Sequence, residues 1–355
     1  MQPSSHIEIA SKTHSYQVIF DSDVKAAVRN ATPSDKRTFF IVDSEVVRTH
    51  EDLKALDGRE IFEVKAVEAN KTIRTVEQIV EWLLANGADK SAHIVGIGGG
   101  IVQDLATFVS HIYYRGISWS YLPTTLLGMC DSCIGGKCAL NLKEFKNQLG
   151  VIHPPSKIVI STAFLETLPR RHILSGYGEM LKLSLTSPNQ FFERFVRSLD
   201  SEGFNLDDVS RDIRSSLESK KWVIERDEYE GDLRRVLNYG HSFGHAIEAA
   251  SKNEISHGEA IVLGMDLINF IGVKSGLTDP TFEDQFRRVA NTHFGLEELL
   301  SRVRPLKGQL IPLLRRDKKV QFGKIHFAFA KKPGELEIHP FELDEDLEMI
   351  VDSYF

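Results

Sequence analysis

The stretch that decides the fold of this 355-residue chain is residues 94–150, which read IVGIGGGIVQDLATFVSHIYYRGISWSYLPTTLLGMCDSCIGGKCALNLKEFKNQLG. It begins with an apolar run that leads into Gly98-Gly99-Gly100 and then into a helix-like segment. A glycine turn between a strand and a helix directs backbone N–H groups toward an anion such as a pyrophosphate. The cluster does not fit G-x-G-x-x-G, because Ile101 takes the place of the last glycine, and a tight turn without a ligand needs the same residues.

The residues before this stretch predict a parallel α/β sheet. Residues 7–20 alternate as a β-hairpin or two short strands do, and residues 23–31 are compatible with a short helix. Apolar runs at 38–43, 61–67 and 93–97 are typical of buried strands. The spacing over 73–87 predicts a helix, so strand and helix alternate as in a Rossmann-like fold. Asp43 ends the first of these runs, where an aspartate either caps a helix or accepts hydrogen bonds from a ribose.

After about Pro169 the sequence pattern changes, and most of the remaining residues form amphipathic stretches with helical spacing. We therefore expect two domains, an α/β N-terminal domain over 1–168 and a mainly α-helical C-terminal domain over 169–355. Residues 325–330 and 336–338 are a late pair of strands, split by Pro333-Gly334. The helices of the second domain are expected at 171–186, 190–199, 206–227, 235–252, 256–275 and 280–301.

The bulk properties exclude several classes of partner. The net charge is −7, and no basic block offsets it, which argues against a nucleic-acid or anionic-membrane partner. No apolar stretch reaches the roughly 18 residues of a membrane span, and the N-terminus lacks an apolar signal core. The three cysteines, Cys130, Cys133 and Cys138, are too few for a secreted disulfide framework, so we expect a cytoplasmic enzyme.

A second group of residues is typical of a metal site. His241 and His245 lie four positions apart and share one face of a helix, and His257 follows within about one further helix. Glu179 supplies a carboxylate. One glutamate and two histidines leave a coordination position open, which is the pattern of a catalytic rather than a structural zinc site. The residues themselves do not decide between His241 and His245, and histidines at this spacing also occur without a metal.

These residues, in this order, resemble the sugar-phosphate cyclase family and, within it, 3-dehydroquinate synthases. The resemblance spans about residues 40–320. It is carried by Gly98-Gly-Gly-(x3)-Asp104, Tyr114-Arg115-Gly116, Pro123-Thr-Thr, Asp131-Ser132, Gly135-Gly-Lys137, Lys146-Asn147, Glu179-(x2)-Lys182, Lys220, Glu230-(x3)-Arg234, Asn238-(x2)-His241-(x3)-His245, His257-Gly-Glu259 and Asp317-Lys-Lys319.

The resemblance implies a phosphate-eliminating lyase that needs NAD and a divalent metal, Zn²⁺ or Co²⁺, and that forms a homodimer. Its substrate would be a small phosphorylated sugar acid, 3-deoxy-D-arabino-heptulosonate 7-phosphate, and its product 3-dehydroquinate of the shikimate pathway, on the way to aromatic amino acids. NAD would take and return one hydride, the metal would polarise the oxidised hydroxyl, and phosphate would leave before an intramolecular aldol step closes the ring.

The family pattern also implies a role for individual residues. The metal ligands would be Glu179, His241 and His257. The substrate carboxylate would bind Lys220 and Arg234, and its hydroxyls would bind Asp131, Lys182 and Glu230. The substrate phosphate would be surrounded by Lys137, Asn147, Asn238, His245, Lys318 and Lys319, with Arg115 from the other subunit. NAD would contact Asp43, Glu68, Lys71, Gly99, Gly100, Asp104, Thr124, Thr125, Lys146, Thr167 and Leu168.

Several neighbours of the site depart from the usual synthase. Cys130 and Cys133 flank Asp131, Cys138 replaces a threonine, and Phe145 stands where glycine is common. These departures indicate a diverged branch and leave alternatives open. One is a sister cyclase of the aminodehydroquinate or valiolone type, which would serve secondary metabolism. A metal-dependent polyol dehydrogenase and a catalytically silent paralogue are the others. Lys220 and Arg234 favour the synthase, because cyclases of sedoheptulose 7-phosphate have no carboxylate to bind.

Overall fold

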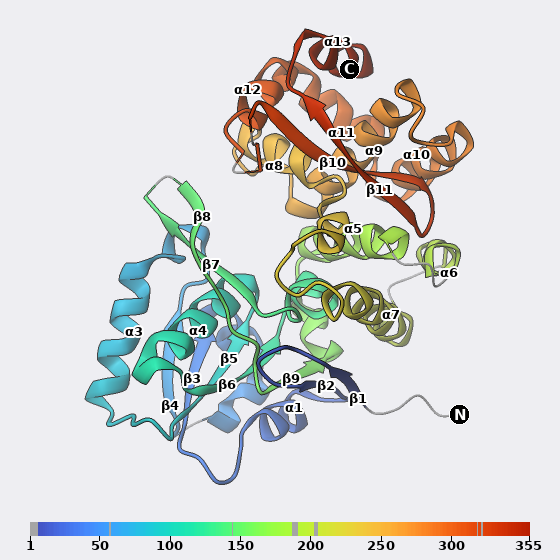
Figure 1. Ribbon diagram of the computed structural model, residues 1–355. Coiled ribbons are helices and arrows are strands. Elements are labelled where there is room, and N and C mark those ends of the chain that lie inside the picture. The colour runs from blue at the N-terminus through green and yellow to red at the C-terminus, as the bar shows by residue number, and fades with distance from the viewer. Residues whose placement is uncertain are drawn as a thin grey trace. The chain divides into compact units, whose positions relative to one another are not determined.

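The computed structural model of the protein describes residues 6–56, 58–143, 145–186, 191–201, 205–317, 319–320 and 322–355. These residues form two compact units. The first ends at Pro169 and is called the sheet unit, and the second begins at Arg170 and is called the helical unit (Figure 1). The predicted fold class, a Rossmann-like α/β domain followed by a mainly helical domain, is confirmed.

The sheet unit is built on a seven-stranded sheet with the strand order β1-β2-β9-β6-β5-β3-β4. Strands β1 and β2 pair antiparallel, as expected for residues 7–20, and every other pair in this sheet is parallel. The strands of this sheet are β1 (His6–Ile9), β2 (Tyr16–Asp21), β3 (Thr38–Asp43), β4 (Glu60–Val64), β5 (His93–Gly98), β6 (Ser118–Pro123) and β9 (Lys157–Ser161).

Burial explains why these strands read as continuous apolar runs. Four consecutive residues of β3, Phe39 to Val42, are fully buried, which is the environment of a central parallel strand covered on both faces. Figure 1 shows helices of this unit lying over the sheet. The helical elements are α1 (Val24–Ala31), α2 (Ser44–Thr49), η1 (Glu51–Leu56), η2 (Glu68–Asn70), α3 (Ile73–Ala85), α4 (Gly100–Ile112), η3 (Tyr113–Arg115), the π-helical turn η4 (Gly128–Ser132) and η5 (Thr162–Thr167).

Apolar periodicity does not indicate the antiparallel hairpin of β7 (Lys137–Leu142) and β8 (Phe145–Ile152). No residue of β8 is buried, so this strand lacks the apolar alternation that marks a half-buried strand. The hairpin contacts α3 and α4, and an isolated bridge joins Asn141 to Thr72. It therefore places polar side chains beside the helix that begins at Gly100.

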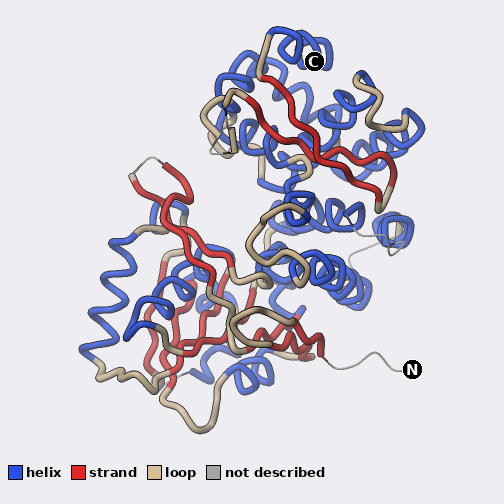
Figure 2. The backbone as a smooth tube through the Cα atoms, viewed as in Figure 1, coloured by secondary structure: helices blue, strands red, loops and turns tan. Residues whose placement is uncertain are grey.

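The helical unit surrounds the buried helix α9 (His257–Lys274), which contacts α5, α8, α10, α11, α13 and β10. Most residues of α9 are buried on all sides, as expected for a central helix. Figure 2 shows β10 and β11 as an antiparallel pair among the helices. The remaining elements are α5 (Arg170–Thr186), α6 (Phe191–Leu199), α7 (Leu206–Ile224), η6 (Leu233–Asn238), α8 (His241–Ala250), α10 (Pro280–Phe294), α11 (Leu296–Val303), η7 (Arg304–Gln309), α12 (Leu310–Leu314), β10 (Lys324–Lys332), β11 (Glu335–Glu342) and α13 (Glu345–Tyr354).

Two predicted helices of this unit were wrong in extent. The stretch 235–252 is a 3₁₀ turn followed by α8, because Gly240 adopts a left-handed conformation with φ of 75° between them. The stretch 280–301 is two helices, because Gly295 has φ of 66° and ends α10. The remaining predicted helices of this unit lie where they were expected, apart from residue 190, which is outside the described ranges.

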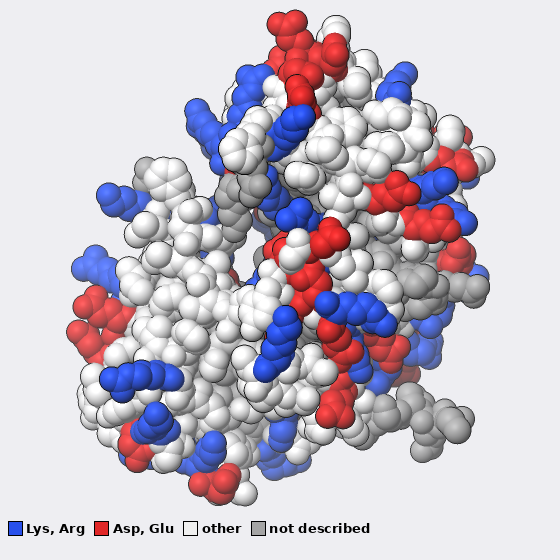
Figure 3. Space-filling view, in the orientation of Figure 1, with Lys and Arg blue, Asp and Glu red and all other residues white. Residues whose placement is uncertain are grey.

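On the face that Figure 3 shows, basic and acidic side chains are interspersed. Among the described residues, no helix combines the length and the apolar character that a bilayer-spanning segment needs.

Candidate active site

The glycine turn lies where the sequence predicted it, between the end of β5 and the start of α4. A β-carbon on Gly98 would lie 2.5 Å from Val102 Cγ2, and one on Gly99 would lie 2.9 Å from Thr125 Cγ2. These two glycines are therefore required by packing, as in any tight turn. A β-carbon on Gly100 would meet nothing within 4 Å. The first residue of α4 thus has open space beside it, into which a phosphate group can approach the backbone.

Predicted nucleotide-binding residues form a buried network beside this turn. Lys71 is only 7% exposed, and its ammonium group lies 3.1 Å from Asp104 Oδ2 and 3.7 Å from Glu68 Oε1. It also donates to Asn147 Oδ1 at 2.7 Å. Burial raises the pKa of Asp104 to about 6, although Lys71 and the Ala139 N–H oppose the shift. Because Asn147 was predicted to contact the substrate phosphate, the structure brings a predicted substrate residue into the predicted NAD network.

The other predicted residues of the sheet unit follow the carboxyl ends of its strands, with the exception of Arg115. Asp43 ends β3, caps α2 by accepting from Glu45 N at 3.1 Å, and has a pKa raised by burial. Thr124 donates from its backbone to the Gly98 carbonyl at 3.0 Å. Thr125, Asp131, Lys137, Lys146, Thr167 and Leu168 lie on β7, on β8 or in the segments after β6 and β9.

Arg115 lies at the opposite end of the sheet. It precedes the first residue of β6, whereas the other predicted residues follow strand ends. The six residues of β6 span roughly 17 Å, so about that length separates Arg115 from the glycine turn. The structure therefore does not bring Arg115 together with the rest of the predicted site in the sheet unit.

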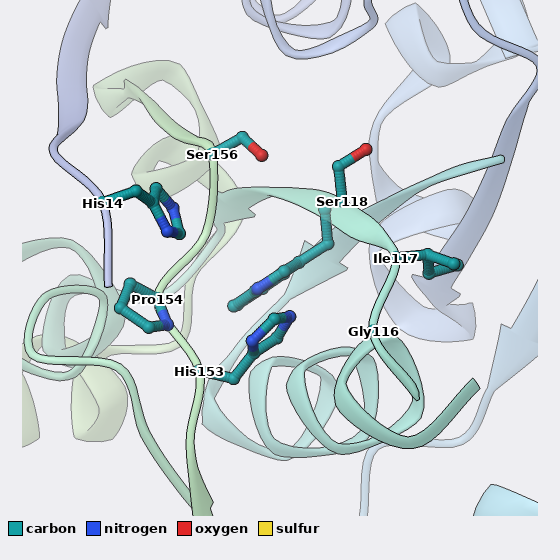
Figure 4. Close-up of a pocket in the computed structure, with 8 residues that line it drawn as sticks. His14, Gly116, Ile117, Ser118, His153, Pro154 and Ser156 are labelled. Atoms are coloured by element: carbon teal, nitrogen blue, oxygen red, sulfur yellow. The ribbon is translucent and has the colours of Figure 1, made fainter. Parts of the chain in front are cut away.

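A pocket of about 320 Å³ opens at this same end of the sheet (Figure 4). It is lined by His14, Trp119, residues 116–118, residues 153–154 and Ser156. None of these residues was predicted to belong to a site. They come from three segments far apart in the sequence, and no motif connects them, so sequence reasoning had no signal for this pocket.

The predicted metal ligands converge in the helical unit. Glu179 is 2% exposed and comes from α5, while His241 and His257 are the first residues of α8 and α9. Glu179 Oε1 lies 2.8 Å from His257 Nε2 and 3.3 Å from His241 Nε2. One donor atom from each of the three residues lies within 4.8 Å of the others. A carboxylate oxygen and two imidazole nitrogens at this separation fit a divalent ion such as Zn²⁺ or Co²⁺.

Charges around Glu179 explain its protonation state. Burial alone would raise the pKa of this carboxyl, but Lys182, whose ammonium lies 2.5 Å from Oε2, and His241 hold the pKa well below its usual range. Burial lowers the pKa of His257, yet its hydrogen bonds to Glu179 and Glu248 outweigh that and raise it to about 10. The pKa of His241 is lowered by burial, against the attraction of Glu179. The cluster therefore holds an anionic carboxylate that attracts positive charge.

A second set of donors lies beside the first and consists of His245, Glu248 and His257. His257 belongs to both sets, because its Nδ1 lies 3.0 Å from Glu248 Oε2. Burial and the neighbouring His241, Lys319 and His257 lower the pKa of His245 to about 2, so this imidazole is neutral. Glu248 was not given a role by the sequence, although a carboxylate behind a metal-bound histidine is a common arrangement.

The predicted carboxylate-binding residues are buried in the helical unit. Lys220 on α7 is 7% exposed and Arg234 in η6 is 3% exposed, and η6 contacts α7. Arg234 donates to the Glu228 carbonyl. Asn238 donates to Glu230 Oε1 at 2.7 Å, which ties two predicted substrate residues together. Lys319 is described, whereas Lys318 lies outside the described residues.

Comparisons with known proteins agree with this architecture. Residues 61–175 match the 3-dehydroquinate synthase N-terminal family, and residues 176–320 match the 3-dehydroquinate synthase C-terminal family. The 3-dehydroquinate synthase of Dictyoglomus thermophilum is 34% identical over 336 residues, which cover 94% of this chain and 93% of the relative. The chain therefore belongs to the 3-dehydroquinate synthase family.

Solved structures of two sister enzymes have the same fold. A 2-deoxy-scyllo-inosose synthase complexed with carbaglucose-6-phosphate, NAD⁺ and Co²⁺ has a TM-score of 0.84 at 23% identity, covering 98% of this chain and 99% of the other. The 2-epi-5-epi-valiolone synthase of Streptomyces hygroscopicus, with NAD⁺ and Zn²⁺ bound, has a TM-score of 0.81 at 26% identity, covering 97% and 98%.

The two donor sets make opposite predictions about metal binding. If Glu179, His241 and His257 hold the ion, Glu179→Gln or His241→Ala weakens Co²⁺ binding at least about 100-fold, because an inner ligand is lost, whereas His245→Ala changes it by less than about tenfold. Titration of Co²⁺ against a chromophoric chelator measures the three affinities. Strong binding by Glu179→Gln together with loss of binding by His245→Ala would assign the ion to the second set.

Proposed function

We propose that this member of the 3-dehydroquinate synthase family converts 3-deoxy-D-arabino-heptulosonate 7-phosphate to 3-dehydroquinate and releases phosphate, with bound NAD and a divalent metal ion. The observation that carries the proposal is the buried pair of Lys220 and Arg234 in the helical unit, in a chain that is 34% identical to a 3-dehydroquinate synthase. Two buried cationic side chains recognise an anionic group such as a substrate carboxylate.

The residues of the helical unit have complementary tasks in this reaction. Glu179, His241 and His257 hold the metal ion. Lys182 lies against Glu179 and keeps that carboxylate ionised, which leaves its oxygens available as ligands. When bound, NAD accepts a hydride from the substrate and returns it, while the metal polarises the hydroxyl that is oxidised. His245, which is exposed on α8, and Lys319 offer hydrogen-bond donors to the substrate phosphate.

In the sheet unit, the open backbone at Gly100 and the start of α4 are suited to the NAD pyrophosphate. Lys71 forms ion pairs with Asp104 and Glu68 and donates to Asn147, so an incoming nucleotide meets a preorganised polar surface. Asp43, at the end of β3, is placed to accept hydrogen bonds from a ribose while it caps α2.

The sister cyclases are the second candidate, because two of the structural neighbours are a 2-deoxy-scyllo-inosose synthase and a valiolone synthase. Their sugar-phosphate substrates carry no carboxylate. Such a substrate offers no carboxylate for Lys220 and Arg234 to recognise, so this pair of cationic side chains would contribute nothing to its selection. The synthase reaction therefore agrees better with this site.

The enzyme is expected to release phosphate from 3-deoxy-D-arabino-heptulosonate 7-phosphate without net formation of NADH, because the hydride returns within each turnover. Phosphate is measured colorimetrically and NADH at 340 nm in the same reaction. Removal of metal with EDTA should abolish turnover, and Zn²⁺ or Co²⁺ should restore it. Phosphate release only from sedoheptulose 7-phosphate would identify a sister cyclase, and accumulation of NADH would identify a dehydrogenase.

Lys220→Ala and Arg234→Ala should each lower kcat/KM roughly 30- to 1,000-fold, mainly through KM, since removing one partner of a buried charge contact costs about 2–4 kcal/mol. Lys221→Ala is the matched control, because this neighbouring lysine lies 3.7 Å from Glu225 and has a third of its side chain exposed. Steady-state kinetics with the heptulosonate substrate test the pair. Unchanged kinetics in both variants would contradict the substrate assignment.

We further propose a homodimer in which Arg115 contacts the substrate phosphate of the partner subunit. Its place at the amino end of β6, away from the other predicted residues of its own sheet unit, supports this role. Mixing Arg115→Ala with Glu179→Gln subunits then creates one complete site per heterodimer, so two inactive variants together should recover about a quarter of wild-type activity after subunit exchange. No recovery, with heterodimers shown by native mass spectrometry, would place Arg115 in its own subunit's site or outside any site.

A further inference from the structure

A buried tyrosine connects one proposed metal ligand to the helix that carries another. Tyr239 has no exposed surface, and its hydroxyl donates to Asn269 Oδ1 at 2.5 Å. Asn269 is also fully buried and lies on α9, twelve residues after His257 begins that helix. The tyrosine side chain is therefore anchored to α9.

The backbone of the same tyrosine holds the imidazole of His241. The Tyr239 carbonyl lies 3.2 Å from His241 Nδ1. A carbonyl can only accept, so Nδ1 carries the proton and the lone pair of a neutral ring is on Nε2. That nitrogen is the one that lies 3.3 Å from Glu179 Oε1. The carbonyl thus selects the tautomer that presents Nε2 to the metal-binding cluster.

Gly240, which lies between Tyr239 and His241, packs directly against α9. A β-carbon on Gly240 would lie 2.5 Å from Met265 Cγ and 2.8 Å from the Ile261 carbonyl. A β-carbon on Gly264 would lie 2.2 Å from the Gly240 carbonyl. The segment 239–241 is therefore fixed to α9 at its backbone by close packing and at its side chain by the Tyr239 hydrogen bond.

We propose that Tyr239 is a positioning residue of the metal site, whose bond to Asn269 fixes the carbonyl that orients His241 relative to His257 on α9. The proposal rests on the proposed function, because it takes Glu179, His241 and His257 as the metal ligands. Tyr239 and Asn269 do not touch the metal in this arrangement. They set the separation and direction of two imidazoles that come from different helices.

The test is Tyr239→Phe, which removes the hydroxyl and preserves the ring that packs in the core. We expect Co²⁺ binding to weaken about tenfold, with a changed intensity of the visible Co²⁺ bands, since the orientation of a metal ligand is loosened. Tyr354→Phe is the matched control. Its hydroxyl donates to Asp266 Oδ2 at 2.6 Å, one turn from Asn269 on the same helix, but Tyr354 has no bond to a proposed ligand. This control should lose stability and keep the wild-type Co²⁺ affinity and spectrum.

A double variant, Tyr239→Phe with Asn269→Leu, separates metal positioning from stability. Leucine has the same branched arrangement of side-chain heavy atoms as asparagine, with methyl groups in place of the amide oxygen and nitrogen. It therefore removes the buried amide that Tyr239→Phe leaves without its donor, and the double variant should regain stability while Co²⁺ affinity stays low. Wild-type Co²⁺ affinity and spectrum in both Tyr239 variants would overturn the inference. Absence of Co²⁺ binding in the wild-type protein would instead overturn the metal site of the proposed function.

Discussion

The helical unit depends on a buried negative charge, the carboxylate of Glu179. A lone carboxylate at 2% exposure costs several kcal/mol of desolvation, so it persists only where cations and hydrogen-bond donors surround it. Lys182 is one turn away on α5, but His241 and His257 must come from two other helices. A glycine beside each ligand permits this approach. A β-carbon on Gly178 would lie 2.4 Å from the Gly258 carbonyl, which brings the backbones of α5 and α9 into contact at the ligands.

The sheet unit also contains a buried charge that its neighbours must stabilise, and this charge is positive. Lys71 is a buried cation, and Asp104, Glu68 and Asn147 surround its ammonium group. These residues come from η2, α4 and β8, so the network connects the hairpin to the helix that follows the glycine turn. Because both charges of the Lys71–Asp104 pair are already offset within the sheet unit, a ligand at Gly100 can bind without having to neutralise either one.

Much of this arrangement could be predicted from the sequence, and the features that could not be predicted have physical causes. The apolar strands and the glycine turn were predictable, because burial on both faces leaves a clear composition. The helix breaks at Gly240 and Gly295 were not predictable. The apolar periodicity continues through both glycines, although their left-handed backbone conformation interrupts the helix. The hairpin β7–β8 was not predicted because β8 buries none of its residues and so shows no apolar alternation. Residue roles taken from the family pattern remain predictions, although within each unit the structure brings several of these residues into contact.

The choice between His241 and His245 shows why spacing alone could not define the metal site. Both histidines lie on α8, so periodicity treats them as equivalent. What distinguishes His241 is the surroundings of its ring, which depend on tertiary structure. The Tyr239 carbonyl holds Nδ1 of His241, and Glu248 holds Nδ1 of His257, so both rings turn Nε2 toward Glu179. Hydrogen bonds to Glu179 and Glu248 outweigh the effect of burial and raise the pKa of His257 to about 10, and in the proposed site a divalent ion would replace the proton between His257 and Glu179. The acceptors behind the imidazoles of His241 and His257 therefore support these two residues as the proposed ligands.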